Sequence, residues 1–191
     1  LKKNTISQFI GTYEKNLLPH LVSNTKRIID SNNKPVIFDI GSSYGYYSTF
    51  FSKFKKCKVV AFEPDIDAFK VLKKIKNKRN NLFLENSEIN EDKMNSMNFQ
   101  SAVAKYGKPN LIKIDIEGYE ERLLLNNLNY FKDYETLIIV EVHSIEIENN
   151  LKTAFKKIGY KIDIIDNDFN TLRIRKVVHN RWLILYNANI H

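Results

Sequence analysis

The chain has 191 residues, 43% of them hydrophobic and 27% charged, so it is long enough to bury a core and has the composition of a soluble globular protein. Lys and Arg outnumber Asp and Glu by 30 to 22, and a net charge of +8 can attract phosphates, anionic glycans or nucleic acid. Because lysine and asparagine are frequent along the whole chain, the excess favours a general compositional bias over a dedicated nucleic-acid patch.

No apolar run approaches the roughly 20 residues that a membrane span needs. Residues 1–18 contain no continuous apolar stretch of the signal-peptide type, which predicts a cytoplasmic location. A single cysteine, Cys57, excludes an internal disulfide framework and argues against a zinc cluster. We expect it to fill space beside a strand.

The period of the apolar residues predicts the secondary structure. The first 30 residues predict one or two leading helices, broken near Pro19. Five short runs rich in Val, Ile and Phe follow, separated by stretches whose apolar residues recur every three or four positions, as in helices. Strand alternating with helix is typical of a parallel sheet covered by helices on both faces. We expect strands at residues 36–40, 58–62, 81–85, 111–116 and 136–142, and helices at 46–54, 67–77, 120–131 and, more loosely, within 88–106.

The last part of the chain predicts a different connection. A helix over residues 147–158 ends at Gly159, which takes the C-cap position. Two strands follow at 160–166 and 181–187, with a further one at 172–178, and only a loop or hairpin joins them, so we expect the sheet to end antiparallel. The fold class is therefore α/β in one domain over residues 1–191, with leading helices to residue 34 and a core over 35–187.

The sequence FDIGSSYG places two glycines four positions apart, directly after the first predicted strand. Gly41 permits a tight turn, and both Gly41 and Gly45 would let a ligand approach the main chain. With Asp39 the spacing is D-x-G-x-x-x-G, which resembles the loop after the first strand of S-adenosylmethionine-dependent methyltransferases. It lacks the G-x-G-x-x-G of dinucleotide binders, which argues against a nicotinamide-dependent enzyme.

Two further segments suggest contacts with a nucleoside. Glu63 ends the second strand about 20 residues beyond the glycine loop, a position suited to gripping ribose hydroxyls. Asp65 is expected to be the N-cap of the next helix. Asn86 and Ser87 follow the third strand, where they could meet an adenine amino group; a simple turn explains them equally well.

Charged residues alternate with apolar ones on two inner strands. In LIKIDIEGYE, Lys113, Asp115 and Glu117 share one face and isoleucines the other. Burying such charges is costly unless they pair or face a site. Glu141 and His143 repeat the pattern at the end of the next strand. Ligands bind at the carboxyl ends of such strands, where Asp115, Glu117 and His143 are expected, whereas Lys113 and Glu141 should lie deeper and pair across neighbouring strands.

Together FDIGSSYGYYS, VVAFEPD, LIKIDIEGYE, IIVEVH and RWLIL resemble the FkbM family of methyltransferases, over about residues 35–187. Ser43 stands where that family commonly has Asn. The resemblance implies a Rossmann-like methyltransferase sheet, S-adenosylmethionine as cofactor, and methyl transfer to oxygen, commonly on a sugar or natural-product hydroxyl. It assigns cofactor binding to Asp39, Gly41, Ser43 and Gly45 of the loop, to Glu63 at the ribose, and to Asp115 at the methionine end.

Methyl transfer to a hydroxyl requires an aligned acceptor and a group that takes its proton. We expect His143 to be this base, because imidazole titrates near neutral pH. Glu117 is the second candidate, either as the base or as the carboxylate that orients His143. A metal-assisted alternative would use Asp115, Glu117 and His143, but Lys113 would compete with a cation there, so no metal is predicted.

Two other functions remain open. The charge of +8 is compatible with an RNA or DNA methyltransferase, although the Asp-Ile-Glu-Gly sequence after the fourth strand lacks the Pro-Pro-aromatic motif of many base-methylating enzymes, and no appended binding module is visible. A cofactor-binding module without catalysis is the other alternative. The motifs favour a small-molecule or glycan acceptor, and they specify neither its identity nor the oligomeric state.

Overall fold

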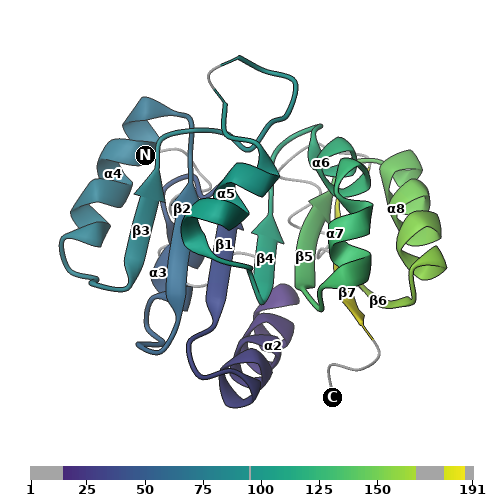
Figure 1. Ribbon diagram of the computed structural model, residues 1–191, viewed down its shortest axis with the longest axis horizontal. Helices are drawn as coiled ribbons and strands as arrows, with labels where there is room; N and C mark the ends of the chain where they lie inside the picture. Colours follow the sequence, from purple (N-terminus) through teal and green to yellow (C-terminus); the bar gives the residue numbers. More distant parts are fainter. Residues whose placement is uncertain (1–14, 95, 167–178, 188–191) are drawn as a thin grey trace.

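The computed structural model describes residues 15–94, 96–166 and 179–187 (Figure 1). In these ranges seven strands form one sheet in the order β3-β2-β1-β4-β5-β7-β6. The strands β1 to β5 pair in parallel, and β7 runs antiparallel to both β5 and β6. The predicted mostly parallel sheet with an antiparallel C-terminal strand is therefore confirmed. The strands are β1 (Val36–Ile40), β2 (Lys58–Phe62), β3 (Leu82–Glu85), β4 (Leu111–Ile114), β5 (Leu137–Val142), β6 (Tyr160–Asp166) and β7 (Arg181–Asn187).

The strand positions follow the apolar runs closely, with one difference that affects the site. The strand β4 ends at Ile114 rather than at residue 116, so Asp115 leaves the sheet and lies at its carboxyl edge. The strand predicted at 172–178 lies outside the described residues.

The helices are α2 (Leu17–Ser31), α3 (Tyr46–Phe51), α4 (Ile66–Lys76), α5 (Phe99–Tyr106), α6 (Glu120–Asn126), α7 (Leu128–Asp133) and α8 (Ile145–Lys157). The helix predicted beyond the break near Pro19 is α2, which begins at Leu17, and Pro19 lies in its first turn, where backbone N–H groups have no helical partner to lose. The leading segment before residue 15 lies outside the described residues. The predicted helix 120–131 is divided at Asn127, whose side-chain amide donates to the Leu123 carbonyl. The caps Asp65 and Gly159 are confirmed: the Asp65 carboxylate accepts from two amides of α4, and Gly159 has φ +87°.

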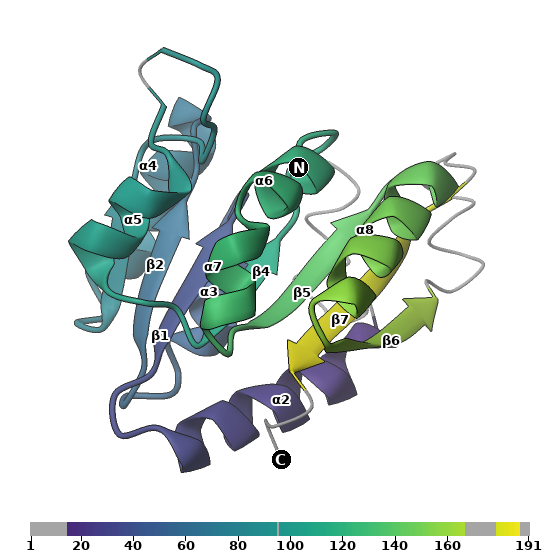
Figure 2. The ribbon, with the colours of Figure 1, turned by 45° about the vertical axis from the view of Figure 1, so that its right-hand side comes forward.

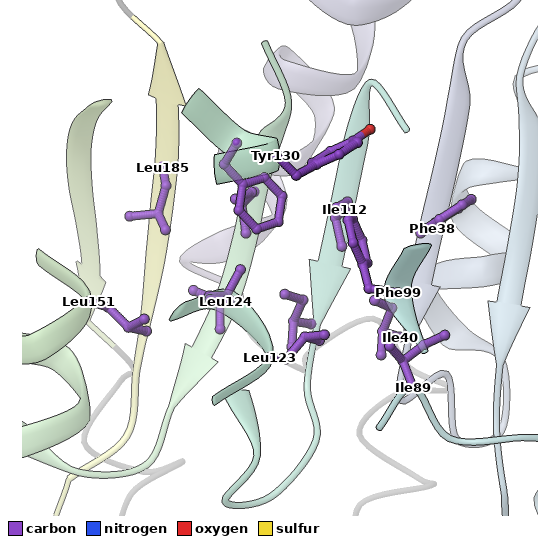
Figure 3. Packing of buried hydrophobic residues seen from close by; sticks show 14 of the residues in the cluster. Phe38, Ile40, Ile89, Phe99, Ile112, Leu123, Leu124, Tyr130, Leu151 and Leu185 are labelled. Atoms are coloured by element: carbon purple, nitrogen blue, oxygen red, sulfur yellow. The ribbon is translucent and has the colours of Figure 1, made fainter. Parts of the chain in front are cut away.

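Helices cover both faces of the sheet, as predicted. Alternate residues of the central strands contribute to two apolar clusters. Phe38, Ile112 and their equivalents pack against α5, α6, α7 and α8, which Figures 1 and 2 show on one face, and Figure 3 shows this packing in detail. Ile37, Leu111 and their equivalents pack against α2, α3 and α4 on the other face. None of the helices described is both long and apolar enough to cross a bilayer.

The strand order reverses between β1 and β4, because β2 and β3 extend the sheet on one side and β4 and β5 on the other. Loops that leave β1 and β4 therefore diverge, and a crevice opens at the carboxyl ends of these strands. In Figure 1 these ends point towards the top, below the loop that precedes α5, while α2 lies at the opposite end. The predicted site residues gather around this crevice.

Candidate active site

The loop between β1 and α3 has an unusual backbone. Gly41 and Gly45 have φ values of +73° and +82°, and Ser43 between them has φ +47°. A Cβ atom on Gly41 would lie 1.9 Å from the Asp115 carbonyl oxygen, and one on Gly45 would lie 2.7 Å from the Leu72 side chain. The positive φ of Gly41 agrees with the predicted tight turn. Both glycines are also required by close approach of the chain to itself, which the sequence did not indicate.

Glu63 connects this loop to the end of β2. Its buried carboxylate accepts hydrogen bonds from the Ser43 amide (2.6 Å) and the Asp65 amide (2.8 Å). Burial raises the pKa of Glu63, and the two amides oppose that rise. A carboxylate has about four acceptor positions, so both oxygens keep capacity for further donors such as ribose hydroxyls.

A pocket of about 280 Å³ lies at the reversal point of the strand order. Four of the predicted site residues line it: Gly41, Glu63, Asp115 and Glu117. Its remaining lining comes from apolar residues at the ends of β1 and β2, from Pro64 and Ile116, and from Glu88, Ile89 and Tyr119, which the sequence analysis did not identify. Among the described residues, the lining contains four carboxylates and no lysine or arginine.

Asn86 and Ser87 do not line this pocket but support the chain around it. The Asn86 amide donates to the carbonyls of Glu63 (2.8 Å) and Pro64 (3.2 Å). The Ser87 hydroxyl donates to the Glu88 carbonyl and accepts from the Met97 amide (3.0 Å). The chain after β3 therefore reaches the pocket two residues later than expected, at Glu88 and Ile89, and the end of β3 at Glu85, which was predicted correctly, does not indicate this.

Asp39 and Lys113 form a buried ion pair between β1 and β4. The Lys113 ammonium is 3.5 Å from Asp39 and 3.4 Å from Asp115, and it donates to the Gly41 carbonyl at 3.0 Å. Burial raises the pKa of Asp39, while Lys113 and the Ser48 hydroxyl, which donates to it at 2.5 Å, oppose the rise. Lys113 on β4 thus pairs with Asp39 on the neighbouring strand β1, as expected for Lys113. Its ammonium also holds the glycine loop through the hydrogen bond to the Gly41 carbonyl.

His143 lies at the end of β5 beside three carboxylates. Its Nδ1 is 2.7 Å from Glu120 Oε1, and its Nε2 is 3.7 Å from Glu141 Oε2. The hydrogen bond with Glu120 raises the pKa of His143; burial opposes this rise, and the nearby charge of Glu141 adds to it. The carboxylate that orients His143 is thus Glu120 rather than Glu117, which is exposed on the pocket wall.

Sequence reasoning missed Glu120 because the stretch EGYEE offers three carboxylates, and the correctly predicted helix start at residue 120 does not indicate which of them faces β5. Glu120 is the first residue of α6 and is fully buried. Its other oxygen accepts from the Gly118 amide at 3.0 Å, which holds the carboxylate in place for His143.

Asp115, Glu141 and His143 come together at this edge. Their potential metal-ligating atoms all lie within 4.8 Å of one another, a set of the kind that binds divalent cations. Glu141 takes the place that the sequence analysis gave to Glu117 in its metal alternative. The Lys113 ammonium, 3.4 Å from Asp115, already supplies positive charge at this position.

Neither a protein-family model nor a curated protein matches the sequence. Solved structures match in shape. An rRNA methylase from Streptococcus thermophilus has a TM-score of 0.63 and 9% identity, with 92% of this chain and 98% of that chain covered. A precorrin-6y C5,15-methyltransferase from Geobacter metallireducens GS-15 has a TM-score of 0.59 and 11% identity, with 87% and 86% covered.

A third match is the methyltransferase FkbM from Methylobacillus flagellatus KT, with a TM-score of 0.63 and 16% identity. The match covers 81% of this chain but only 44% of that one, so this chain spans less than half of the FkbM structure. At these identities the comparisons concern the fold. The chain has the Rossmann-like fold that these methyltransferases share.

Proposed function

We propose that this protein is an S-adenosylmethionine-dependent methyltransferase that methylates a hydroxyl group of a sugar or another small molecule. The observation that carries the proposal is the pocket at the strand reversal, which Gly41, Glu63 and Asp115 line together and where the Glu63 carboxylate accepts from the Ser43 amide of the glycine loop. Three of the five FkbM-like motifs, FDIGSSYGYYS, VVAFEPD and LIKIDIEGYE, contribute residues to the lining of this pocket. The fold shared with other methyltransferases supports the same class of reaction.

The residues fit the cofactor chemically. Its sulfonium and ammonium groups are cationic, and four carboxylates with no lysine or arginine line the pocket. Glu63 retains acceptor positions for two ribose hydroxyls, and Asp115 would attract the amino group of the methionine end. The glycine loop would be shaped by Asp39, Ser43 and Gly45. The chain that faces the adenine would be held in place by Asn86 and Ser87.

When bound, S-adenosylmethionine supplies an electrophilic methyl group. The protein must then orient the acceptor and remove its proton. His143 would take the proton at Nε2, because Glu120 engages Nδ1, and the resulting imidazolium would be stabilised between Glu120 and Glu141. Glu117, exposed on the pocket wall, would orient the acceptor hydroxyl or serve as the alternative base.

The pocket also bears on the type of acceptor. Carboxylates repel a phosphate placed next to the reacting hydroxyl, and no lysine or arginine of the lining would offset this repulsion. This favours a neutral or amine-bearing hydroxyl compound over a nucleic-acid strand as the methyl acceptor.

Calorimetric titration with S-adenosylmethionine tests the proposal. We expect the native chain to bind it, NADH to give no signal, and Glu63→Gln to weaken binding about tenfold, because charge-assisted hydrogen bonds contribute roughly 1.5–3 kcal/mol each. Glu121→Gln removes the same charge from an exposed carboxylate that contacts Asn150, and should leave binding unchanged. A folded native chain that does not bind the cofactor would rule out the proposal. Binding without methyl transfer to any hydroxyl acceptor would instead favour a non-catalytic module.

A further inference from the structure

The two ends of the sheet differ in the charge of the described residues that line them. At the carboxyl ends of the strands, the charged residues described in the pocket lining are all acidic. At the opposite end of the sheet, lysines collect instead.

A second hollow, of about 580 Å³, lies at the amino ends of β1, β2 and β3. Four lysines line it, Lys34, Lys55, Lys56 and Lys58, and its lining contains no carboxylate. A neighbouring hollow of about 400 Å³ adds Lys74, Lys78 and Arg79. Arg79 of this neighbouring hollow is followed in the chain by Asn80 of the larger one, and we call the larger hollow, lined by the four lysines, the basic groove.

Three of these lysines are available for a ligand. Lys34, Lys55 and Lys56 are exposed, and none of them forms an ion pair with a carboxylate in the described part of the chain. Lysines in the last turn of a helix, such as those that end α4, complement the helix dipole. Lys34, Lys55 and Lys56 lie in loops, so this structural explanation does not cover them.

An aromatic ring lies among these charges. Phe83 is 38% exposed and lines the basic groove, with the ammonium groups of Lys58 and Lys76 at 5.3 and 5.7 Å from its ring centroid. Lys58 is held there by a hydrogen bond to the Tyr106 carbonyl at 2.7 Å. The exposed amide of Asn80 lies in the same groove. Lysines, an exposed ring and an amide in a concave surface match a phosphodiester strand with bases that can stack.

We propose that the basic groove binds single-stranded nucleic acid, held mainly through its phosphates and by stacking of a base on Phe83. A hollow that contains a ring suits a strand better than a membrane surface, which would require a flat array of lysines with apolar side chains to insert. The five residues of β1 separate the groove from the active-site pocket by about 17 Å. The bound strand is therefore a docking partner and leaves the pocket free for the methyl acceptor.

Fluorescence anisotropy with a labelled 12-nucleotide oligouridine tests this inference. We expect binding whose logarithm falls with the logarithm of salt concentration with a slope of about −3, as for roughly four phosphate contacts. Replacing Lys34, Lys55 and Lys56 by Glu should weaken binding at least tenfold and bring the slope to about −1. The matched control replaces Lys156, Lys157 and Lys161, which are also exposed, and alters the net charge equally. It should bind nearly as well as the native chain.

Phe83→Leu distinguishes a stacked strand from a general polyanion. We expect this variant to bind oligouridine at least threefold more weakly with an unchanged salt slope, and to bind heparin as the native chain does. Unchanged calorimetric binding of S-adenosylmethionine would show that each variant is folded. Equal losses in the two triple-lysine variants would overturn the inference, as would binding of oligouridine that is insensitive to Phe83→Leu. Stronger binding to vesicles containing phosphatidylserine than to oligouridine would assign the groove to membranes instead.

Discussion

Gly41 is the position where the active-site loop depends most on the absence of a side chain. Its φ of +73° disfavours other residues, and the Asp115 carbonyl occupies the place of a Cβ atom. Gly159 has a similar φ of +87°, but no atom lies within 4 Å of the place where its Cβ would be. The two glycines therefore separate the cost of backbone strain from the cost of a steric clash.

We expect Gly159→Ala to lower the free energy of unfolding by about 1–2 kcal/mol, the cost of the left-handed conformation alone. Gly41→Ala should cost at least about 2 kcal/mol more, because β1 and the Asp115 segment must also move apart. Urea unfolding of both variants measures the difference. Equal losses would mean that the loop relaxes without disturbing Asp115.

His143 gives the second prediction at this scale. Because Glu120 raises the pKa of His143, the ring should titrate above its ordinary value of about 6.5 in the native chain. Glu120→Gln should lower this pKa, while Glu121→Gln, on the same helix but in contact with Asn150, should not. An NMR titration that follows the imidazole proton resonances of His143 measures this pKa in each variant. The His143→Gln variant identifies the signals, because they are absent from its spectrum.

If His143 removes the acceptor proton, the same shift must appear in catalysis. Methyl transfer would fall as pH drops through the raised pKa, since the protonated ring cannot accept a proton. In Glu120→Gln this acidic limb should move to lower pH, with a lower maximal rate because the ring is less well oriented. An acidic limb that stays in place while the NMR titration shifts would assign the proton to another group.

At the level of elements, the strands were predictable because each is a short apolar run bounded by turn or charged residues. The strand pattern also placed Gly41, Glu63, Asp115 and Glu117 correctly around one pocket. What the sequence could not provide was the direction of individual side chains. The start of α6 at Glu120 and the end of β3 at Glu85 were predicted correctly, but neither boundary indicates that Glu120 reaches His143 or that Glu88 rather than Ser87 lines the pocket.

Pro19 lies in the first turn of a helix rather than in its interior. Proline interrupts a helix only where its missing N–H and its ring conflict with a preceding turn. Leu17 begins α2, so Pro19 has no preceding turn to conflict with. The apolar period alone did not reveal that starting point.

The ion pair between β1 and β4 gives a prediction at this scale. Lys113→Met leaves Asp39 buried without its cation, so we expect a loss of about 3–5 kcal/mol in the free energy of unfolding. Adding Asp39→Asn should recover at least about 1 kcal/mol, because the isolated charge is then absent. Urea unfolding of the single and double variants tests this. A double variant less stable than Lys113→Met would show that Asp39 has other essential partners.

The loss in the free energy of unfolding caused by Lys113→Met should also depend on pH. Burial raises the pKa of Asp39 and Lys113 opposes that rise, so removing Lys113 raises it further above the unfolded value. A group with a raised folded pKa contributes more stability as pH falls, because the folded state then binds more protons than the unfolded state. The loss caused by Lys113→Met should therefore be smaller at pH 5 than at pH 8.

At the scale of the whole molecule, charge is divided along the strand direction. Carboxylates line the pocket where the parallel strands end, and lysines line the groove where β1, β2 and β3 begin. Helix dipoles favour this division, because helices that follow parallel strands begin at the carboxyl end and finish at the amino end of the sheet. Two ligands of opposite charge, a cationic cofactor and an anionic strand, can therefore occupy the two ends together.

This division predicts that the two ligands bind independently. The dissociation constant for S-adenosylmethionine, measured by calorimetry with and without saturating oligouridine, should change by less than about twofold, because the two sites lie at opposite ends of the strands. Linkage requires that any coupling be reciprocal, so the reverse titration, of oligouridine in saturating cofactor, should give the same factor. Mutual weakening of tenfold or more would instead place part of the strand in the acidic pocket. In that case the strand would be the methyl acceptor, and the preference for a small hydroxyl compound would be wrong.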